Sequence, residues 1–328
     1  PTFNVEPGTV LYLQLWGYGG QTGGVTICAM DPGTVELESS VLPILVIETN
    51  EQTIGEEDKI TVDLQVLYNG PGVENFITDS PSDYDGKIGI EIRGATSAGY
   101  PQKPYGFETR NLDGTNNNVV LVDMPAENDW VLLSNFNDRS FIRNTLAQHL
   151  YAKMGNYAPR ATLCEVQLNG NYQGVYVLGE KIKRDAERLD IATLNPDENA
   201  GDDVTGGYLL QMNYWNNENS WELSYSPPAH PTFDVHLRYE IPKPEVITPS
   251  QKDYIAAFVD SMETALYSDA FDDPTAGYRE FLDVESFIDY FLLNELSRNN
   301  DGFKKSRFFF KDKHSNGGKF KAGPPWDF

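Results

Sequence analysis

The sequence is poor in the residue types that build sulfur, metal and membrane sites. Its only cysteines are Cys28 and Cys164, which excludes a disulfide framework and a cysteine-based zinc site and allows at most one bridge. The longest apolar run, residues 41–47, is interrupted by Pro43 and is too short to span a membrane. Four histidines occur without the spacing of metal ligands: His149, His230, His236 and His314.

Basic residues are also scarce relative to acidic ones. The 328 residues include 25 Lys and Arg against 49 Asp and Glu, a net charge of −24. Such a surface repels nucleic acids and anionic membranes and favours basic partners, or metal ions at clustered carboxylates. With 40% hydrophobic and 12% aromatic residues the composition is that of a globular protein, and the length suggests two domains or one large one.

Hydrophobic periodicity predicts strands first and helices later. Alternating patterns predict antiparallel strands over residues 1–40 and further strands over 41–95. Two hairpins are expected, one turning at Asn169-Gly170 and one joining residues 307–312 to 318–323. Helices are expected over three ranges: 140–154 with Ser140 as its N-cap, 250–266 with a capping box of Ser250 and Asp253, and 283–298.

One acidic residue between the last helix and the last hairpin stands out. The residues Asn-Asn-Asp-Gly around Asp301 are strong turn formers, and a turn is the ordinary interpretation of such a stretch. However, the order of elements here is also that of the catalytic half of a protein kinase: a helix, a loop with Asp, a polar residue five positions later (Ser306), a hairpin and then Asp327-Phe328. Phosphoryl transfer depends on positioning and charge neutralisation, so it needs oxygen ligands for a metal close to a base.

Longer blocks of sequence indicate which protein family has this order of elements. The chain resembles the spore-coat protein H (CotH) kinase family, in order from about residue 42 to residue 328, through the blocks "RGATSAGYPQKPYGFE", "MPAENDWVLLSNFNDRSFIRNTLAQHLYAKMGNYAPR", "CEVQLNGNYQGVYVLGEKIKRDAERLDI", "GGYLLQMN", "FIDYFLLNELSRNNDGFKKSRFFFKD" and "AGPPWDF".

The resemblance implies an α+β, bilobal protein-kinase-like fold. A β-rich segment over residues 1–40 would precede a kinase-like domain over 41–328, with a β-rich N-terminal lobe over about 41–180 and a helical C-terminal lobe over 181–328. The family usually continues with another Asp after "WDF", so the domain is expected to be truncated after Phe328. The implied activity is ATP-dependent phosphorylation of protein Ser or Thr with Mg²⁺, or with Mn²⁺ or Ca²⁺.

Carried over residue by residue, the resemblance makes Asp301 the catalytic base and Asp327 a metal ligand. Ser306 would be the second metal ligand, at a position where many relatives have Asn.

The implied nucleotide loop comprises Arg93, Gly94 and Ser97. Lys103 would pair with the α- and β-phosphates, with Arg93 as the alternative cation, although a solvated surface lysine is an equally good interpretation of Lys103. The segment around Glu180 occupies the place of a kinase hinge.

Kinases orient the phosphate-binding lysine with a Glu on the following helix, but helix 140–154 contains no acidic residue. Glu108, Glu165 and Glu180 are the candidates to replace it. Asp138, Arg139 and Arg143 fit structural roles better than catalytic ones, with Asp138 able to cap the helix.

The expected partners are a nucleotide and one or more protein substrates, basic or rich in Ser and Thr, with the chain itself a monomer. The family resemblance places it outside the cytoplasm, secreted, periplasmic or on the cell surface. Another function remains open, that of a surface binding or adhesion module with weak catalysis on a kinase-like scaffold. A carbohydrate-active protein is disfavoured because no facing pair of carboxylates can be identified.

Overall fold

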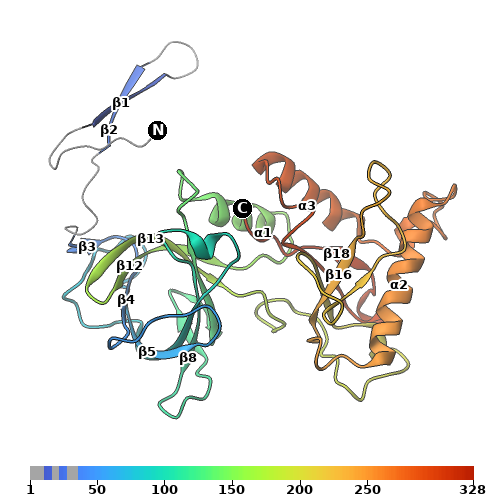
Figure 1. The fold of residues 1–328 in the computed structure, drawn as a ribbon, viewed down its shortest axis with the longest axis horizontal. Coiled ribbons are helices and arrows are strands. Elements are labelled where there is room, and N and C mark those ends of the chain that lie inside the picture. The colour runs from blue at the N-terminus through green and yellow to red at the C-terminus, as the bar shows by residue number, and fades with distance from the viewer. Residues whose placement is uncertain (1–10, 17–21, 28–35) are drawn as a thin grey trace. The chain divides into compact units, whose positions relative to one another are not determined.

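A computed structural model describes residues 11–16, 22–27 and 36–328 (Figure 1). Near its start, β1 (Leu11–Trp16) and β2 (Thr22–Ile27) pair as antiparallel strands, as predicted for part of residues 1–40. Cys28 lies outside the described residues, and Cys164 is buried. The chain forms two compact units, residues 1–136 with 163–176 and residues 137–162 with 177–328.

A closed seven-stranded barrel dominates the first unit. Its strands follow one another in the order β11-β13-β12-β4-β5-β7-β8. Alternate residues of the strands fill the barrel, since Val62, Leu64 and Val66 are all at most 1% exposed. The strand bounds are β4 (Ile44–Glu48), β5 (Ile60–Leu67), β7 (Tyr84–Ile92), β8 (Tyr105–Arg110), β11 (Asp129–Ser134), β12 (Ala161–Leu168) and β13 (Asn171–Glu180). Two small sheets accompany it: β3 (Ser39–Ser40) with β6 (Asn75–Phe76), and β9 (Val119–Leu121) with β10 (Met124–Glu127).

The hairpin between β12 and β13 confirms a sequence prediction. Asn169 and Gly170 both have positive φ, 49° and 75°. These are the conformations that a tight two-residue hairpin turn needs, and Asn and Gly adopt them most readily. The neighbouring β4 pairs with β12 in parallel, which closes that side of the barrel.

The second unit is built on a five-stranded sheet in the order β15-β16-β14-β17-β18. These strands are β14 (Tyr208–Met212), β15 (Ser220–Glu222), β16 (His236–Ile241), β17 (Arg307–Lys311) and β18 (Phe320–Ala322). The hairpin of β17 and β18 is the second one predicted. The described residues also form three α-helices: α1 (Arg143–Lys153), α2 (Pro249–Tyr267) and α3 (Val284–Ser297).

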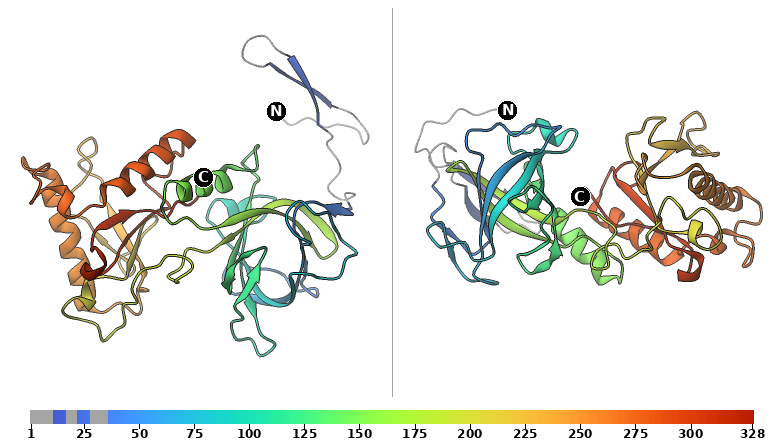
Figure 2. Two further views of the ribbon diagram at one scale, coloured as in Figure 1. Left: turned by 180° about the vertical axis from the view of Figure 1, so that it is seen from behind. Right: turned by 90° about the horizontal axis from the view of Figure 1, so that it is seen from below.

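Helices and sheet of this unit share one hydrophobic core. Ile255 and Val259 of α2 pack with Leu210 of β14 and Phe309 of β17, and Tyr290 of α3 belongs to the same cluster. The two views in Figure 2 show α2 running alongside the sheet. The fold is therefore a mixture of helices and strands with a seven-stranded barrel, which is the coarse class predicted.

The helix positions match the sequence predictions, but two of the caps do not. The N-cap of α1 is Ile142, so the N-cap assigned to Ser140 is wrong, and Asp138 accepts the backbone N–H of Arg143, the first residue of the helix, at 2.9 Å. The capping box of α2 consists of Thr248 and Gln251 instead of Ser250 and Asp253. The reason is Pro249, which fits the first turn of a helix and thus moves the start one residue earlier.

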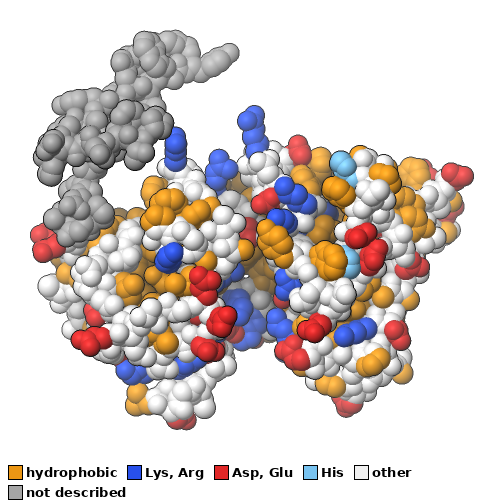
Figure 3. All heavy atoms as spheres, viewed as in Figure 1, with side chains coloured by type: hydrophobic (Ala, Val, Ile, Leu, Met, Phe, Trp, Pro, Cys, Tyr) orange, Lys and Arg blue, Asp and Glu red, His pale blue; other side chains and the backbone are white. Residues whose placement is uncertain are grey.

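Two features of the folded chain reflect its composition: the distribution of its acidic side chains and the hydropathy of its helices. On the face shown in Figure 3, Asp and Glu side chains are spread over both units and do not gather in one patch. None of the helices among the described residues is long and apolar enough to cross a membrane.

One buried acid makes the second unit sensitive to pH. Glu263 of α2 is 8% exposed and accepts the backbone N–H of Ser224 at 3.2 Å. Its pKa is raised to about 7, mainly by burial and also by the nearby Asp260, against the lowering effect of the Ser224 bond. The folded chain therefore binds a proton at Glu263 that the unfolded chain releases above its ordinary pKa.

We predict that Glu263→Gln stabilises the chain at alkaline pH. The stabilisation from the raised pKa is complete below the unfolded value of 4.5 and is lost as pH rises through about 7. In urea unfolding, the free energy of unfolding of the variant relative to that of wild type should rise by about 1–3 kcal/mol from pH 5 to pH 8. Exposed Glu245→Gln is the matched control, and parallel pH profiles for wild type and Glu263→Gln would contradict the prediction.

Candidate functional site

The loop of residues 298–306, the Asp301 loop, is fixed by its own backbone. It begins where α3 ends, at Arg298 in the left-handed conformation with φ 52°. The carbonyl of Asp301 accepts the backbone N–H groups of Lys304 and Lys305 at 2.8 and 2.7 Å. The Asp301 side chain is 57% exposed, and its Oδ1 lies 3.1 Å from Lys304 Nζ. The local prediction of a turn is confirmed, and the carboxylate faces solvent.

Packing against α3 determines where this loop lies. Tyr290 donates its hydroxyl to the carbonyl of Gly302 at 3.0 Å, and Asn294 donates its side-chain amide to the carbonyl of Tyr290 at 2.8 Å. A Cβ added to Gly302 would lie 1.8 Å from Asn294 Oδ1. Only glycine therefore allows the loop to approach the helix this closely.

The two metal ligands predicted from the sequence are brought together. Ser306 donates its hydroxyl to Asp327 Oδ2 at 2.6 Å. Both residues have left-handed backbones, with φ of 51° and 59°. Asn299 donates its side-chain amide to the carbonyl of Asp327 at 3.2 Å, while its Oδ1 accepts the N–H of Asp301 at 3.2 Å. A single side chain thus links Asp327 to the Asp301 loop.

Sequence reasoning missed the role of Asn299. The available signal was its place two residues before Asp301, where an Asn side chain can accept backbone N–H groups in a turn. Its second bond, to a residue 28 positions later, has no local signature. Asn144 of α1 makes a similar distant contact, since it accepts the N–H of Phe328 at 3.0 Å.

These oxygens fit a magnesium-type ion. In the described part of the chain no group of three or more His, Cys, Asp or Glu could hold a metal ion. Mg²⁺ is commonly held by only one or two carboxylates together with phosphates and water, so a dedicated cage is not required. The Asp327 carboxylate and the Ser306 hydroxyl are hard oxygen donors already in contact, and they suit such an ion.

A cavity of about 450 Å³ lies beside the Asp301 loop. The Arg307 guanidinium lies 4.6 Å from the Phe309 ring and 5.4 Å from the Tyr290 ring. Burial lowers the pKa of Arg307. The cavity is mostly apolar and combines aromatic rings with one residue of each charge: Phe287, Tyr290, Phe291, Glu295, Phe303 and Arg307.

In the first unit, the four residues predicted to bind nucleotide share one closed loop between β7 and β8. Arg93 donates its backbone N–H to the carbonyl of Pro104 at 3.0 Å, and Lys103 Nζ donates to the carbonyl of Ala98 at 2.6 Å. Gly94 has φ 95°, and a Cβ there would lie 2.2 Å from Ser97 Oγ. The loop therefore has the close backbone packing that phosphate-binding loops use, and the Lys103 ammonium is tied to it.

Two of the carboxylates considered as partners of Lys103 have other partners. Glu108 contacts Arg110 and Lys59, the latter at 3.2 Å. Glu165 accepts the Tyr172 hydroxyl at 2.6 Å and the hydroxyl of Ser40 at 2.9 Å.

Glu180, the third candidate, is fully buried in the second unit. Its carboxylate accepts the backbone N–H and the guanidinium of Arg160, both at 2.8 Å, and Arg188 Nε lies 3.7 Å away. Such pairing offsets the cost of burying charged groups. These contacts therefore fix the chain segment that, from the family resemblance, was expected to correspond to a kinase hinge.

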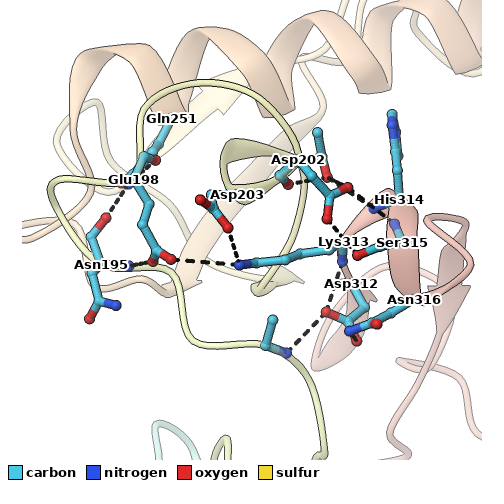
Figure 4. Close-up of polar contacts among 12 residues, drawn as sticks. Asn195, Glu198, Asp202, Asp203, Gln251, Asp312, Lys313, His314, Ser315 and Asn316 are labelled. Carbon is cyan, nitrogen blue, oxygen red and sulfur yellow. Dashed lines mark hydrogen bonds and ion pairs between the residues drawn. The ribbon is translucent and has the colours of Figure 1, made fainter.

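A polar network fixes the turn between β17 and β18 (Figure 4). Lys313 reaches Asp203 at 2.6 Å and Glu198 at 3.6 Å, while Asp202 accepts the N–H of Ser315 at 3.1 Å. Hydrogen bonds from Ser315 lower the pKa of Asp202. Because these acids already have partners, the network serves to hold residues 195–203 against the hairpin.

Residues 90–328 match the family described as CotH kinase protein. The chain belongs to the CotH kinase family. The matched range contains every candidate residue discussed above, from Arg93 to Asp327. No curated protein matches the chain. Membership of the CotH kinase family points to a kinase-like protein, and a kinase implies ATP and a metal ion.

We predict that Gly302→Ala destabilises the second unit through its overlap with Asn294. Forcing a methyl group into this contact should cost about 1–3 kcal/mol in urea unfolding. The double variant Gly302→Ala with Asn294→Ala should lose less stability than the two single variants added together, because truncating Asn294 vacates the space. Strictly additive losses would show that the contact does not limit this position.

Proposed function

We propose that the chain is an ATP-dependent protein kinase that transfers the γ-phosphate to a Ser or Thr hydroxyl, with Asp301 as the catalytic base. Membership of the CotH kinase family supports the reaction class. The observation that carries the residue assignment is the link from Asp327 to Ser306 at 2.6 Å and, through Asn299, to the Asp301 loop. The proposed base and the two proposed metal ligands are thereby connected, although Asp327 lies more than 20 residues beyond the Asp301 loop.

The chemical roles follow from exposure and charge. Asp301 is exposed and therefore accessible to an acceptor hydroxyl, and Lys304 Nζ lies 3.1 Å from its carboxylate. Asp327 and Ser306 would hold Mg²⁺, or Mn²⁺ or Ca²⁺. When bound, such an ion supplies neutralisation of phosphate charge. Asn299 holds the loop and Asp327 in register, so that the base and the ligands keep a fixed spacing.

In the same proposal the Arg93–Lys103 loop binds the nucleotide. Gly94 lets the backbone approach the phosphates, Ser97 and Arg93 line the loop, and Lys103 is the cation for the α- and β-phosphates. Glu180 contributes by fixing the segment that follows β13. The proposal includes the bilobal, kinase-like fold that the family resemblance implies.

The proposed substrates are extracytoplasmic or coat-type proteins. A chain with a net charge of −24 attracts basic partners, which favours basic or Ser- and Thr-rich segments as acceptors. The proposed location is outside the cytoplasm, and the proposed acting form is a monomer.

We predict that Asp301→Asn abolishes most phosphotransfer. The amide has nearly the shape of the carboxylate but cannot accept the hydroxyl proton, so the rate should fall on the order of 10²–10⁴-fold. The measurement is transfer of labelled phosphate from ATP to a Ser- and Thr-containing acceptor protein in Mg²⁺ or Mn²⁺. Exposed Asp269→Asn is the control, and equal transfer by wild type and Asp301→Asn would refute the assignment.

A second candidate function is a surface binding module with weak catalysis. Ser306 favours it, because a hydroxyl is a weaker metal ligand than the Asn amide carbonyl found in many relatives. The two functions differ in whether nucleotide binds and is turned over.

Nucleotide binding should appear as thermal stabilisation. With ATP and Mg²⁺ at about 100 times the Kd, wild type should gain about 2.7 kcal/mol. We predict that Lys103→Met loses most of this gain, because the phosphates lose their cation, whereas Lys87→Met, which removes an ion pair with Asp63, retains it. A wild type that does not respond to ATP would favour the binding module.

A further inference from the structure

The pairing of β14 with β17 extends beyond the end of the ladder through side chains. The register runs from Tyr208 opposite Lys311 to Met212 opposite Arg307. Two steps further along the same register, Tyr214 faces Lys305. Lys305 Nζ donates to the Tyr214 hydroxyl at 2.7 Å and lies 4.1 Å from the centre of its ring. One tyrosine therefore offers this ammonium both a hydrogen-bond acceptor and a ring face.

Tyr214 is itself held in place. Its carbonyl accepts Arg238 Nη1 at 2.9 Å, and its N–H is bonded to the side-chain oxygen of Asn213 at 2.8 Å. The next residue, Trp215, stacks on His236 with ring centres 3.4 Å apart and planes inclined by 9°. Although Tyr214 is 60% exposed, its backbone is held by the contacts that Arg238 and His236 of β16 make with residues 214 and 215. It can therefore act as a rigid support.

Lys305 connects Tyr214 to Asp301 and to Ser306, which lie before and after it in the chain. Its backbone N–H donates to the Asp301 carbonyl at 2.7 Å. It directly precedes Ser306, whose hydroxyl is bonded to Asp327. The contacts described above for the Asp301 loop come from the loop itself, from α3 and from Asp327. Tyr214 adds a restraint from the loop that follows β14.

We propose that Tyr214 is a positioning residue for phosphotransfer: through Lys305 it holds the Asp301 loop at the spacing that the base and Ser306 require. This inference rests on the proposed function of that loop. Tyr214 does not act on the substrate; its effect passes through one ammonium.

The test separates the hydroxyl, the ring and the ammonium. Tyr214→Phe removes the acceptor and keeps the ring, whereas Lys305→Met removes the ammonium and with it both contacts. Each should lower kcat roughly 3- to 10-fold, the value of one ordinary hydrogen bond, while the KM for ATP stays within 2-fold. The double variant should be no slower than Lys305→Met alone. Lys305→Arg, which can still donate to the phenol, should restore most of the rate.

Tyr267→Phe is the matched control, since it also removes the hydroxyl of a tyrosine that makes one hydrogen bond, here as donor to the carbonyl of Ser226 at 3.2 Å. It should leave kcat unchanged. Multiplicative losses in the double variant, or an equal loss in Tyr267→Phe, would overturn the proposal, because the pair would then not act as one unit.

A second measurement does not depend on activity. Amide hydrogen exchange of residues 301–305 should be about 3- to 10-fold faster in Tyr214→Ala than in wild type and unchanged in Tyr267→Phe. If wild type transfers no phosphate while this difference is present, the proposed function fails and the positioning contact stands. If wild type is active and the exchange rates are equal, the positioning inference fails alone.

Discussion

The antiparallel pairing of β14 with β17 is the constraint on which the candidate site depends. It joins segments about 100 residues apart, Tyr208–Met212 and Arg307–Lys311, at a single register. A slip of one residue would turn every side chain of β17 to the opposite face of the sheet. Phe309 would then leave the core and the Asp301 loop would shift along α3. The hydrophobic core of the second unit therefore also fixes the geometry of the site.

Two residues of the site have backbone conformations that residues of their type rarely adopt. Ser306 and Asp327 both occupy the left-handed region, which is uncommon for residues other than glycine and is less unusual for Asp than for Ser. Such conformations cost on the order of 1–3 kcal/mol and persist where surrounding structure enforces them. Here they aim the hydroxyl and the carboxylate at one another. Strain at these two neighbouring positions is consistent with a site selected for chemistry over stability.

Much of the local structure could be predicted because its causes are local. The turn residues at 299–302 and the Asn169-Gly170 hairpin each act within a few positions of the chain. The caps of α1 and α2 were misplaced by only a few residues because several Ser, Thr and Asp compete there. The link from Asn299 to Asp327 and the pairing of Glu180 with Arg160 and Arg188 were not predicted. They depend on which segments the fold brings together, and no short sequence window contains that information.

The register between β14 and β17 also affects how the sequence can diverge. The position of Tyr214 opposite Lys305 is set within two residues of the ladder, whereas the rest of the β14–β15 loop comes later in the chain. Residues inserted or deleted beyond Trp215 would leave Tyr214 opposite Lys305. Relatives can therefore vary the length and chemistry of this loop, and with it the surface presented beside the Asp301 loop, without moving the residues proposed to carry out phosphotransfer.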